Sequence, residues 1–316
     1  MESLRFYPRT IPSEVWGVVV VKKQNVVTLL LLGYLAIVVI FMIVKNISIT
    51  PDRFVIFLFF GAVLVGRVGP FVRDWAPFLG LLLGYEILRG FADDKGLGVH
   101  VESLVNIERF LFGFIPTEKL QSLLYHAGSV SWYDWVAVVV YFLHFPLPLT
   151  IAFLLWMKDK LQFNKFIIAL LVLSFSGFIT FLLLPAAPPW YAAERGLIQT
   201  HKIIETLISQ IGWNWNLSQF YDNLNPNPVA AMPSLHAAYP WLSFLALRRY
   251  SKKLGWFFLP YPFLVWFAIV YLGEHYVIDA IAGVIYAQVS FWVVYDFGKI
   301  RNFITRIYPK ARMPKF

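Results

Sequence analysis

The sequence contains no cysteine, and this absence removes several kinds of site at once. Disulfide frameworks, thiolate zinc sites, iron–sulfur clusters and cysteine nucleophiles are excluded, and the redox compartment stays undetermined. Charge is also scarce, because Asp, Glu, Lys and Arg make up only 14% of the 316 residues, against about a quarter in an ordinary soluble domain. A soluble globular enzyme, a disordered chain and a rod-like coiled coil are therefore excluded.

Long apolar runs take the place of charge in this sequence. Hydrophobic residues make up 59% of it, aromatic residues 18%, and the mean hydropathy is +0.65. Because a membrane-crossing helix needs about 20 apolar residues, the sequence predicts an all-α polytopic membrane protein with about eight transmembrane helices. We expect them at approximately 25–44, 54–68, 75–88, 135–156, 166–184, 234–250, 254–272 and 278–295, with Gly69-Pro70 breaking the second from the third.

The distribution of Lys and Arg predicts the topology. If the first span, which is too long for a cleaved signal peptide, starts inside, 19 of the 27 Lys and Arg residues fall on the cytoplasmic side. This bias is the one expected for cytoplasmic segments, so both termini are predicted to be cytoplasmic. We interpret the net charge of +9 as this topology signal and as a contact with anionic lipids, not as a nucleic-acid-binding surface.

Two segments predicted to lie outside are long for plain connectors, and long ordered loops often carry function. Residues 91–134 contain FLFGFIPTEKLQSLLYH, which is typical of an amphipathic segment lying on the bilayer surface. Residues 185–233 are rich in Trp, Asn and Pro. With neither a repeat nor a linker, the chain is predicted to form a single integral-membrane domain over 1–316.

Two histidine motifs are predicted to open membrane helices. In Met232-Pro-Ser-Leu-His236, Pro233 suits a first helical turn, and a helix N-terminus presents N–H groups that suit a phosphate. In Gly273-Glu-His275-Tyr-Val-Ile-Asp279, the spacing of four places His275 and Asp279 on one helix face, so the carboxylate can fix the imidazole tautomer. Each motif alone is also explained by a plain helix start or an interfacial ion pair.

Taken together, the two motifs point to phosphoryl transfer. From His236 the chain is predicted to cross the membrane inward to Tyr250 and to return to Leu272, so both histidines reach the outer face. Two histidines, a carboxylate and two helix N-termini supply a nucleophile, a proton donor and positive charge around a phosphate. A metal site made by the two histidines and Asp279 is the alternative use of the same residues.

Further positive charge is predicted to come from Arg89 and Arg195, because a guanidinium can hold a phosphate through two hydrogen bonds. Each is equally compatible with an ordinary membrane-edge arginine. Ser234 and Tyr85 complete the predicted substrate-binding set, and His144 is interpreted as a polar contact inside a helix. Several amides of the long second loop are candidates for hydroxyl recognition or a solvated surface: Asn214, Asn216, Gln219, Asn225 and Asn227.

The motifs, taken in order, resemble the type 2 phosphatidic acid phosphatase superfamily and its inositol-phosphorylceramide-synthase-like branch. They are YEILR, FLFGFIPTEKLQ, HFPLPL, LPAAPPW, AMPSLHAAYPW and GEHYVIDAIAG, spread over approximately 85–286. The resemblance implies a six-helix catalytic core, here 71–298, with extra helices in 1–70 and a basic cytoplasmic tail at 299–316. It also implies a histidine nucleophile at His275, an orienting Asp279 and an acid/base His236.

The sequence departs from the superfamily pattern at the phosphate-binding positions. A Lys and an Arg-Pro seven residues apart are not found, and Ile269 stands where an arginine commonly precedes the nucleophile by six residues. Leu235 stands where a glycine precedes the histidine in other members. These departures assign phosphate contacts to Arg89 and Arg195, and they favour the transferase branch over a simple phosphatase.

The resemblance implies a membrane lipid phosphotransferase that moves a phospho-head group, with phosphoinositol as the candidate, from a phospholipid to a lipid alcohol through a phosphohistidine. The alternative is a phosphatase that acts on a lipid phosphate or a polyprenyl (pyro)phosphate with water as the acceptor. A transporter or scramblase is a third hypothesis. That class needs charges along a path through the bundle, and the predicted helix centres are nearly free of charge.

No cofactor and no metal are expected, because the phosphohistidine route can rely on Arg side chains and helix N-termini. The expected partners are the phospholipid donor and the lipid acceptor in the bilayer, and no nucleic acid. The active site is expected at the extracytoplasmic face. The host membrane is then the plasma membrane in a prokaryote, or the Golgi or a similar membrane in a eukaryote.

Overall fold

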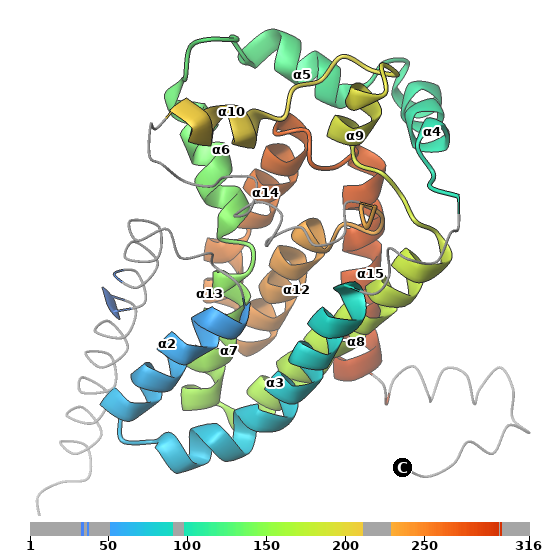
Figure 1. Cartoon of the computed structure of the whole chain (residues 1–316). Helices are drawn as coiled ribbons and strands as arrows, with labels where there is room; N and C mark the ends of the chain where they lie inside the picture. Colours follow the sequence, from blue (N-terminus) through green and yellow to red (C-terminus); the bar gives the residue numbers. More distant parts are fainter. Residues whose placement is uncertain are drawn as a thin grey trace, which may run out of the picture.

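The computed structural model describes residues 33, 34, 37, 51–90, 98–210, 229–296 and 298, which form a bundle of helices joined by loops (Figure 1). In this part of the chain there is no strand, and the extended segments make only the isolated bridges of His100 and Ala230 with Ala186. The predicted all-α class is therefore confirmed.

Helix α12 (Leu235–Tyr250) lies in the middle of the bundle (Figure 1). Its buried side chains include Ala238, Leu242 and Phe244, each at most 2% exposed. A helix that is apolar on all sides is typically surrounded by other helices. Around α12 pack α7 (Pro146–Lys158), α8 (Lys160–Leu183), α13 (Lys252–Phe258), α14 (Pro260–Tyr271) and α15 (Val277–Tyr295).

Helices α2 (Pro51–Leu64) and α3 (Val68–Gly90) pack against α7 and α8 on the outside of the bundle. The break between them lies at Gly66, which has a φ of 68°, and not at Gly69-Pro70 as the sequence predicts. Pro70 lies in the first turn of α3, where its missing N–H leaves no hydrogen bond unmade. The second and third predicted spans therefore start and end at other residues than expected.

Two predicted spans are interrupted at prolines. Residues 135–156 form α6 (Trp132–Phe142) and α7, which meet at an angle of 49° because Pro146 begins a new helix after a turn. Residues 254–272 form α13 and α14, and Pro260 stands at the start of α14. A proline is tolerated in a first helical turn. Because it has no N–H, it cannot donate the hydrogen bond that would continue a preceding helix.

The helices account for several predicted membrane spans. Within the described residues, three segments are long and apolar enough to cross a membrane. They are α8 (Lys160–Leu183), α13 with α14 (Lys252–Tyr271) and α15 (Val277–Tyr295). The bent pair of α6 and α7 is a fourth if it forms one span. The predicted span at 25–44 lies almost wholly outside the described residues, so the total of eight spans and the divisions at 70 and 298 stay predictions.

A layer of short helices covers the end of the bundle at which α14 ends and α15 begins (Figure 1). It consists of α4 (Glu102–Phe112), α5 (Pro116–Leu124), α9 (Pro189–Glu194) and α10 (Ile203–Gln210). Gly113, with a φ of 76°, ends α4 and allows the sharp turn into α5. The predicted amphipathic segment thus forms the end of α4 and all of α5, with Phe110 87% exposed and Leu123 61% exposed. Its contact with a bilayer surface stays a prediction.

Candidate active site

His236 stands in the first turn of α12, and the residues before it build the start of that helix. Ser234 is the N-cap, and its Oγ accepts a hydrogen bond of 3.2 Å from the backbone N–H of Ala237. A serine at this position satisfies one of the N–H groups that a helix start leaves unpaired. Pro233 precedes the cap instead of lying in the first turn, which corrects the prediction from the sequence.

His275 lies in the turn between α14 and α15, just before the helix that carries Asp279. Gly273 has a φ of 83°, a left-handed conformation that suits glycine, and the turn is held by a hydrogen bond of 3.1 Å from the N–H of His275 to the carbonyl oxygen of Ile269. The Asp279 carboxylate lies 3.5 Å from Nδ1 of His275 and accepts a 2.9 Å hydrogen bond from the N–H of Tyr276. The expected proximity of the two side chains is therefore confirmed, although only Asp279 is on the helix.

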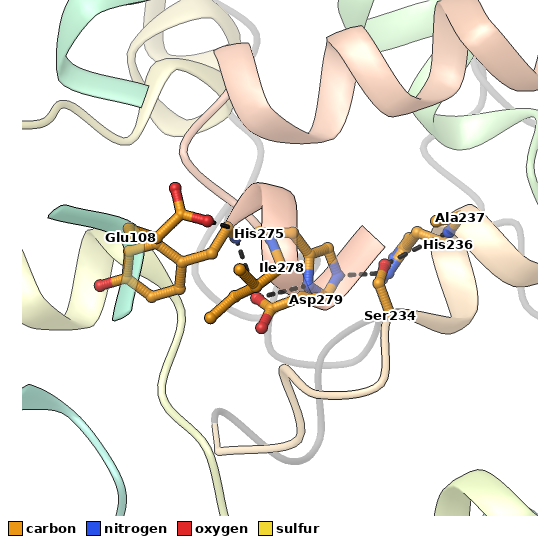
Figure 2. Close-up of polar contacts among 8 residues, drawn as sticks. Glu108, Ser234, His236, Ala237, His275, Ile278 and Asp279 are labelled. Carbon is orange, nitrogen blue, oxygen red and sulfur yellow. Dashed lines mark hydrogen bonds and ion pairs between the residues drawn. The ribbon is translucent and has the colours of Figure 1, made fainter. Parts of the chain in front are cut away.

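The two histidines meet. Nδ1 of His236 lies 2.9 Å from Nε2 of His275, and Figure 2 shows the two side chains and Asp279 in one row. Asp279 is fully buried and His275 is 4% exposed. The chain of contacts from Asp279 through His275 to His236 joins α15 to α12, so two segments 39 residues apart form one polar group.

A close backbone contact fixes the two helix starts against each other. The N–H of Ser234 donates a 3.0 Å hydrogen bond to the carbonyl oxygen of Asp279. Gly283, one turn further along α15, faces the same residue, and a Cβ atom there would lie only 2.1 Å from the carbonyl oxygen of Ser234. Glycine is therefore required at 283 for this approach.

A third histidine, His144, joins the group, and sequence reasoning placed it wrongly. It lies in the turn between α6 and α7, not inside a helix, and it is 5% exposed. Its ring centroid is 4.1 Å from that of His236, while the Tyr141 ring stacks on His236 at 4.9 Å and 17°. The signal for this position was Pro146, which breaks a long apolar run next to a polar residue.

Glu108 of α4 is a second residue near the site that sequence reasoning missed. Its side chain is fully buried, and Oε1 accepts a 3.0 Å hydrogen bond from the N–H of Ile278 in the first turn of α15 (Figure 2). Burial, and to a lesser degree the nearby Asp279, raise the pKa of Glu108 to about 7. No sequence pattern links the two positions, because they are 170 residues apart.

The predicted substrate-binding residues lie at different places. The Arg195 guanidinium is exposed, donates to the Tyr191 hydroxyl at 2.7 Å and lies over that ring, and no described contact joins it to the histidines. Arg89 is in the last turn of α3, and its side chain lies outside the described part. Tyr85 is buried in the core against rings of α8. Ser234 is fully buried and caps α12, and its role in substrate binding stays a prediction.

The outer layer of short helices holds the turn that carries His275. The side-chain amide of Gln121 on α5 donates to the carbonyl oxygens of His201 and Tyr271, both at 2.9 Å. The N–H of Trp190 on α9 donates a 3.2 Å hydrogen bond to the carbonyl oxygen of Gly273. These bonds come from both long segments between the predicted spans, 91–134 and 185–233, so both segments help to hold the turn.

An apolar groove of about 380 Å³ lies beside the site, between α5, α14 and α15. Two of its lining residues, Val277 and Ala280, are close in sequence to His275 and Asp279. A third, Trp266, donates its indole N–H to the carbonyl oxygen of Ala237 at 3.1 Å, next to His236. The other lining residues are Pro116, Leu120, Phe267, Val270, Ile281, Val284 and Ile285.

Comparison with known families matches residues 102–293 to the PAP2 superfamily. The chain belongs to the PAP2 superfamily. The match contains His144, His236, His275 and Asp279, so the whole polar group lies inside the part that defines membership. The resemblance expected from the sequence is confirmed, and this PAP2 chain is an enzyme of the lipid phosphotransferase and phosphatase class, embedded in the membrane.

Among curated proteins, this PAP2 chain is similar to the phosphoinositol dihydroceramide synthase of Bacteroides thetaiotaomicron, with 26% identity over 73% of this chain and 80% of that protein. It is also similar to catalytic subunits of inositol phosphorylceramide synthase. The subunit of Saccharomyces cerevisiae is 24% identical over 82% of this chain and 65% of that protein. The subunit of Schizosaccharomyces pombe is 26% identical over 61% of this chain and 46% of that protein. No solved structure matches the chain.

Two further expectations concern ligands of this PAP2 site. Among the described residues, no group of three His, Asp or Glu side chains is arranged to hold a metal ion. The amide cluster proposed for hydroxyl recognition, from Asn214 to Asn227, lies outside the described residues.

Proposed function

We propose that the protein transfers a phosphoinositol head group from a phospholipid to the hydroxyl of a long-chain lipid alcohol through a phosphohistidine. The observation that carries the proposal is the 2.9 Å contact between His236 and His275, with Asp279 behind His275. The named activities of the similar synthases support the choice of head group and of a ceramide-like acceptor.

In the first step, Nε2 of His275 attacks the phosphorus of the donor. Asp279 lies on the Nδ1 side, so it favours the tautomer with a proton on Nδ1 and stabilises the imidazolium that forms. The P–O bond to the diacylglycerol breaks, and His236 gives a proton to the leaving oxygen. Because Nε2 contacts His236 in the resting protein, the phosphate has to enter between the two rings.

In the second step, His236 takes the proton of the acceptor hydroxyl, and the acceptor oxygen attacks the phosphorus. The bond between phosphorus and Nε2 of His275 breaks, which returns the free imidazole and releases the new phospholipid. One histidine thus acts as nucleophile in both steps, and the other acts first as acid and then as base. No step uses a metal ion.

The groove beside the site suits the hydrocarbon part of such a substrate. Its walls are apolar and belong to α5, α14 and α15, and two of the lining side chains, Phe267 and Ile281, are about half exposed. We assign to it one hydrocarbon chain of the lipid substrate, whose head group then lies at the level of His275.

The proposal also includes an orientation, with both termini cytoplasmic and the histidines at the extracytoplasmic face. Because the chain has no cysteine, the labelling of a single introduced cysteine can show on which side of the membrane its residue lies. With Ser129→Cys, in the exposed loop before α6, we expect labelling by an impermeant maleimide from outside intact cells, and with Lys253→Cys only after permeabilisation. The reverse pattern contradicts the orientation.

The decisive experiment uses purified protein, phosphatidylinositol labelled in its phosphate, and a ceramide acceptor. A new labelled phospholipid that depends on the acceptor supports the transferase. Release of labelled inositol phosphate, unchanged by the acceptor, identifies a hydrolase instead. Release of inorganic phosphate from labelled phosphatidate or a polyprenyl phosphate, given in a parallel assay, identifies the phosphatase. Lipid flux in proteoliposomes that does not change in a His275→Ala variant identifies a transporter.

A further inference from the structure

The first turn of α15 carries the residues on which the proposed chemistry depends, and its N–H groups need partners from elsewhere. Helix starts leave N–H groups unpaired, and Ser, Thr, Asp or Asn at the N-cap usually accept from them. Here the N-cap is Tyr276, whose side chain is not of that kind. Asp279 of the same helix accepts from the N–H of Tyr276, and a partner for the N–H groups that follow must come from another element.

Glu108 supplies that partner from α4. Its Oε1 accepts a 3.0 Å hydrogen bond from the N–H of Ile278. The Asp279 carboxylate accepts from the N–H of Tyr276 at 2.9 Å. The N–H groups of Tyr276 and Ile278 at the start of α15 are thus held by two carboxylates, one from the same helix and one from α4.

The surroundings of Glu108 indicate that it holds other parts of the protein in place and does not contact the substrate. The residue is fully buried, and its second oxygen is buried without a hydrogen-bond partner among the described residues. The neighbouring Arg109 donates a 3.2 Å hydrogen bond to the carbonyl oxygen of Leu197, so α4 is fixed to the loop after α9. The Glu108 side chain therefore links α4, which Arg109 fixes to the loop after α9, to the first turn of α15.

We propose that Glu108 is a positioning residue, which caps α15 from α4 and so fixes the turn that presents His275 and Asp279 to the phosphate. The inference rests on the proposed use of His275 as the nucleophile. A displacement of about 1 Å at a reacting group can reduce a rate about 100-fold. Loss of the cap is therefore expected to lower kcat far more than it changes KM.

The test compares four variants of the full chain. Glu108→Leu fills the same space without an acceptor, whereas Glu108→Gln keeps an oxygen that can accept from the N–H of Ile278. Glu102→Gln is the matched control, because Glu102 is on the same helix but exposed. Glu108→Asp withdraws the carboxylate by one methylene group and serves if the leucine variant does not fold, as judged by thermal unfolding in detergent.

We expect kcat of Glu108→Leu to fall about 10- to 100-fold, with KM changed less than about threefold. The glutamine variant should restore kcat to within about threefold of the parent protein, and Glu102→Gln should not differ from it. A parental kcat in the leucine or aspartate variant overturns the proposal, as does an equal loss in the glutamine and leucine variants.

Binding of orthovanadate, which forms a five-coordinate mimic of phosphoryl transfer, separates this inference from the identity of the lipids. We expect the parent protein to bind vanadate, and Glu108→Leu to bind it at least about tenfold more weakly. If the parent binds vanadate but does not use phosphatidylinositol, the proposed substrate fails while the affinity difference still supports Glu108. Equal affinity in the parent and Glu108→Leu overturns the role of Glu108 alone. Absence of binding in the parent overturns both.

Discussion

The N–H of Ser234 donates a 3.0 Å hydrogen bond to the carbonyl oxygen of Asp279, so the cap of one helix is fastened to the first turn of another. His236 follows Ser234 by two residues, and His275 precedes Asp279 by four. This backbone bond therefore helps to hold the two segments that carry the imidazoles against each other. The following predictions test this arrangement and the chemistry proposed for it.

Replacement of His275 by Ala should abolish formation of the new phospholipid, because the proposed route uses Nε2 of His275 as the nucleophile. Asp279→Asn should leave weak activity, lowered by about 10⁴-fold if the wrong tautomer dominates as in other histidine sites. The measurement is turnover of labelled phosphatidylinositol by the purified variants. His126→Ala, at an exposed histidine, is the control. Turnover at the parental rate by the His275→Ala protein contradicts the assignment.

His144→Ala should lower kcat by about tenfold or more, because the His144 ring packs against His236 at 4.1 Å and limits the orientations of that ring. His144→Phe keeps an aromatic ring and should recover most of the activity if packing is the cause. Steady-state kinetics of the two variants decides this. Equal losses in both would show that the nitrogen atoms of His144 are needed.

Gly283→Ala should prevent the close approach of α15 to Ser234, since the added Cβ would lie 2.1 Å from a backbone oxygen. Overpacking of this kind typically costs about 1–3 kcal/mol in the free energy of unfolding. We expect a lower Tm and little remaining transfer activity. Gly84→Ala in α3, where a Cβ meets nothing within 4 Å, is the matched control and should not lower the Tm. A parental Tm and activity in Gly283→Ala would show that the helices can shift.

Stability should depend on pH through Glu108, whose pKa is raised by burial from 4.5 to about 7. The folded state favours the protonated form, so the stability linked to this group is complete below about pH 4.5 and is lost as pH rises through 7. We expect the Tm of the parent protein to fall between pH 5 and pH 8 by more than that of Glu108→Gln. Thermal unfolding across this range, with Glu102→Gln as the control, measures the difference. Parallel curves would contradict the raised pKa.

Val284→Phe should narrow the apolar groove and disfavour substrates with long chains, because Val284 lines it between α14 and α15. We expect the ratio of kcat/KM for long-chain over short-chain substrate to fall about tenfold. Val289→Phe adds the same ring to an exposed position of α15, 47% exposed and not among the groove residues, and should leave the ratio unchanged. Equal effects in both variants would argue against a hydrocarbon chain in the groove.

The sequence by itself determined the helical class and the pairing of the two histidine motifs. Continuous apolar runs of membrane length predict helices, because the strands of a membrane barrel alternate apolar and polar residues. The run from His236 to Leu272 is long enough to return to the side on which it began. The order of the motifs was sufficient to identify the superfamily. Prolines also marked where runs are interrupted, although the position of the break before α3 was displaced by three residues.

The tertiary structure alone decided which other side chains reach the histidines. His144 comes from the bend between two helices and Glu108 from a surface helix, and neither is linked to α12 or α15 by any spacing in the sequence. It also placed Arg195 on Tyr191 and Ser234 in a cap. Periodicity reports only which face of its own helix a residue occupies, whereas contacts between elements depend on how all the helices pack together.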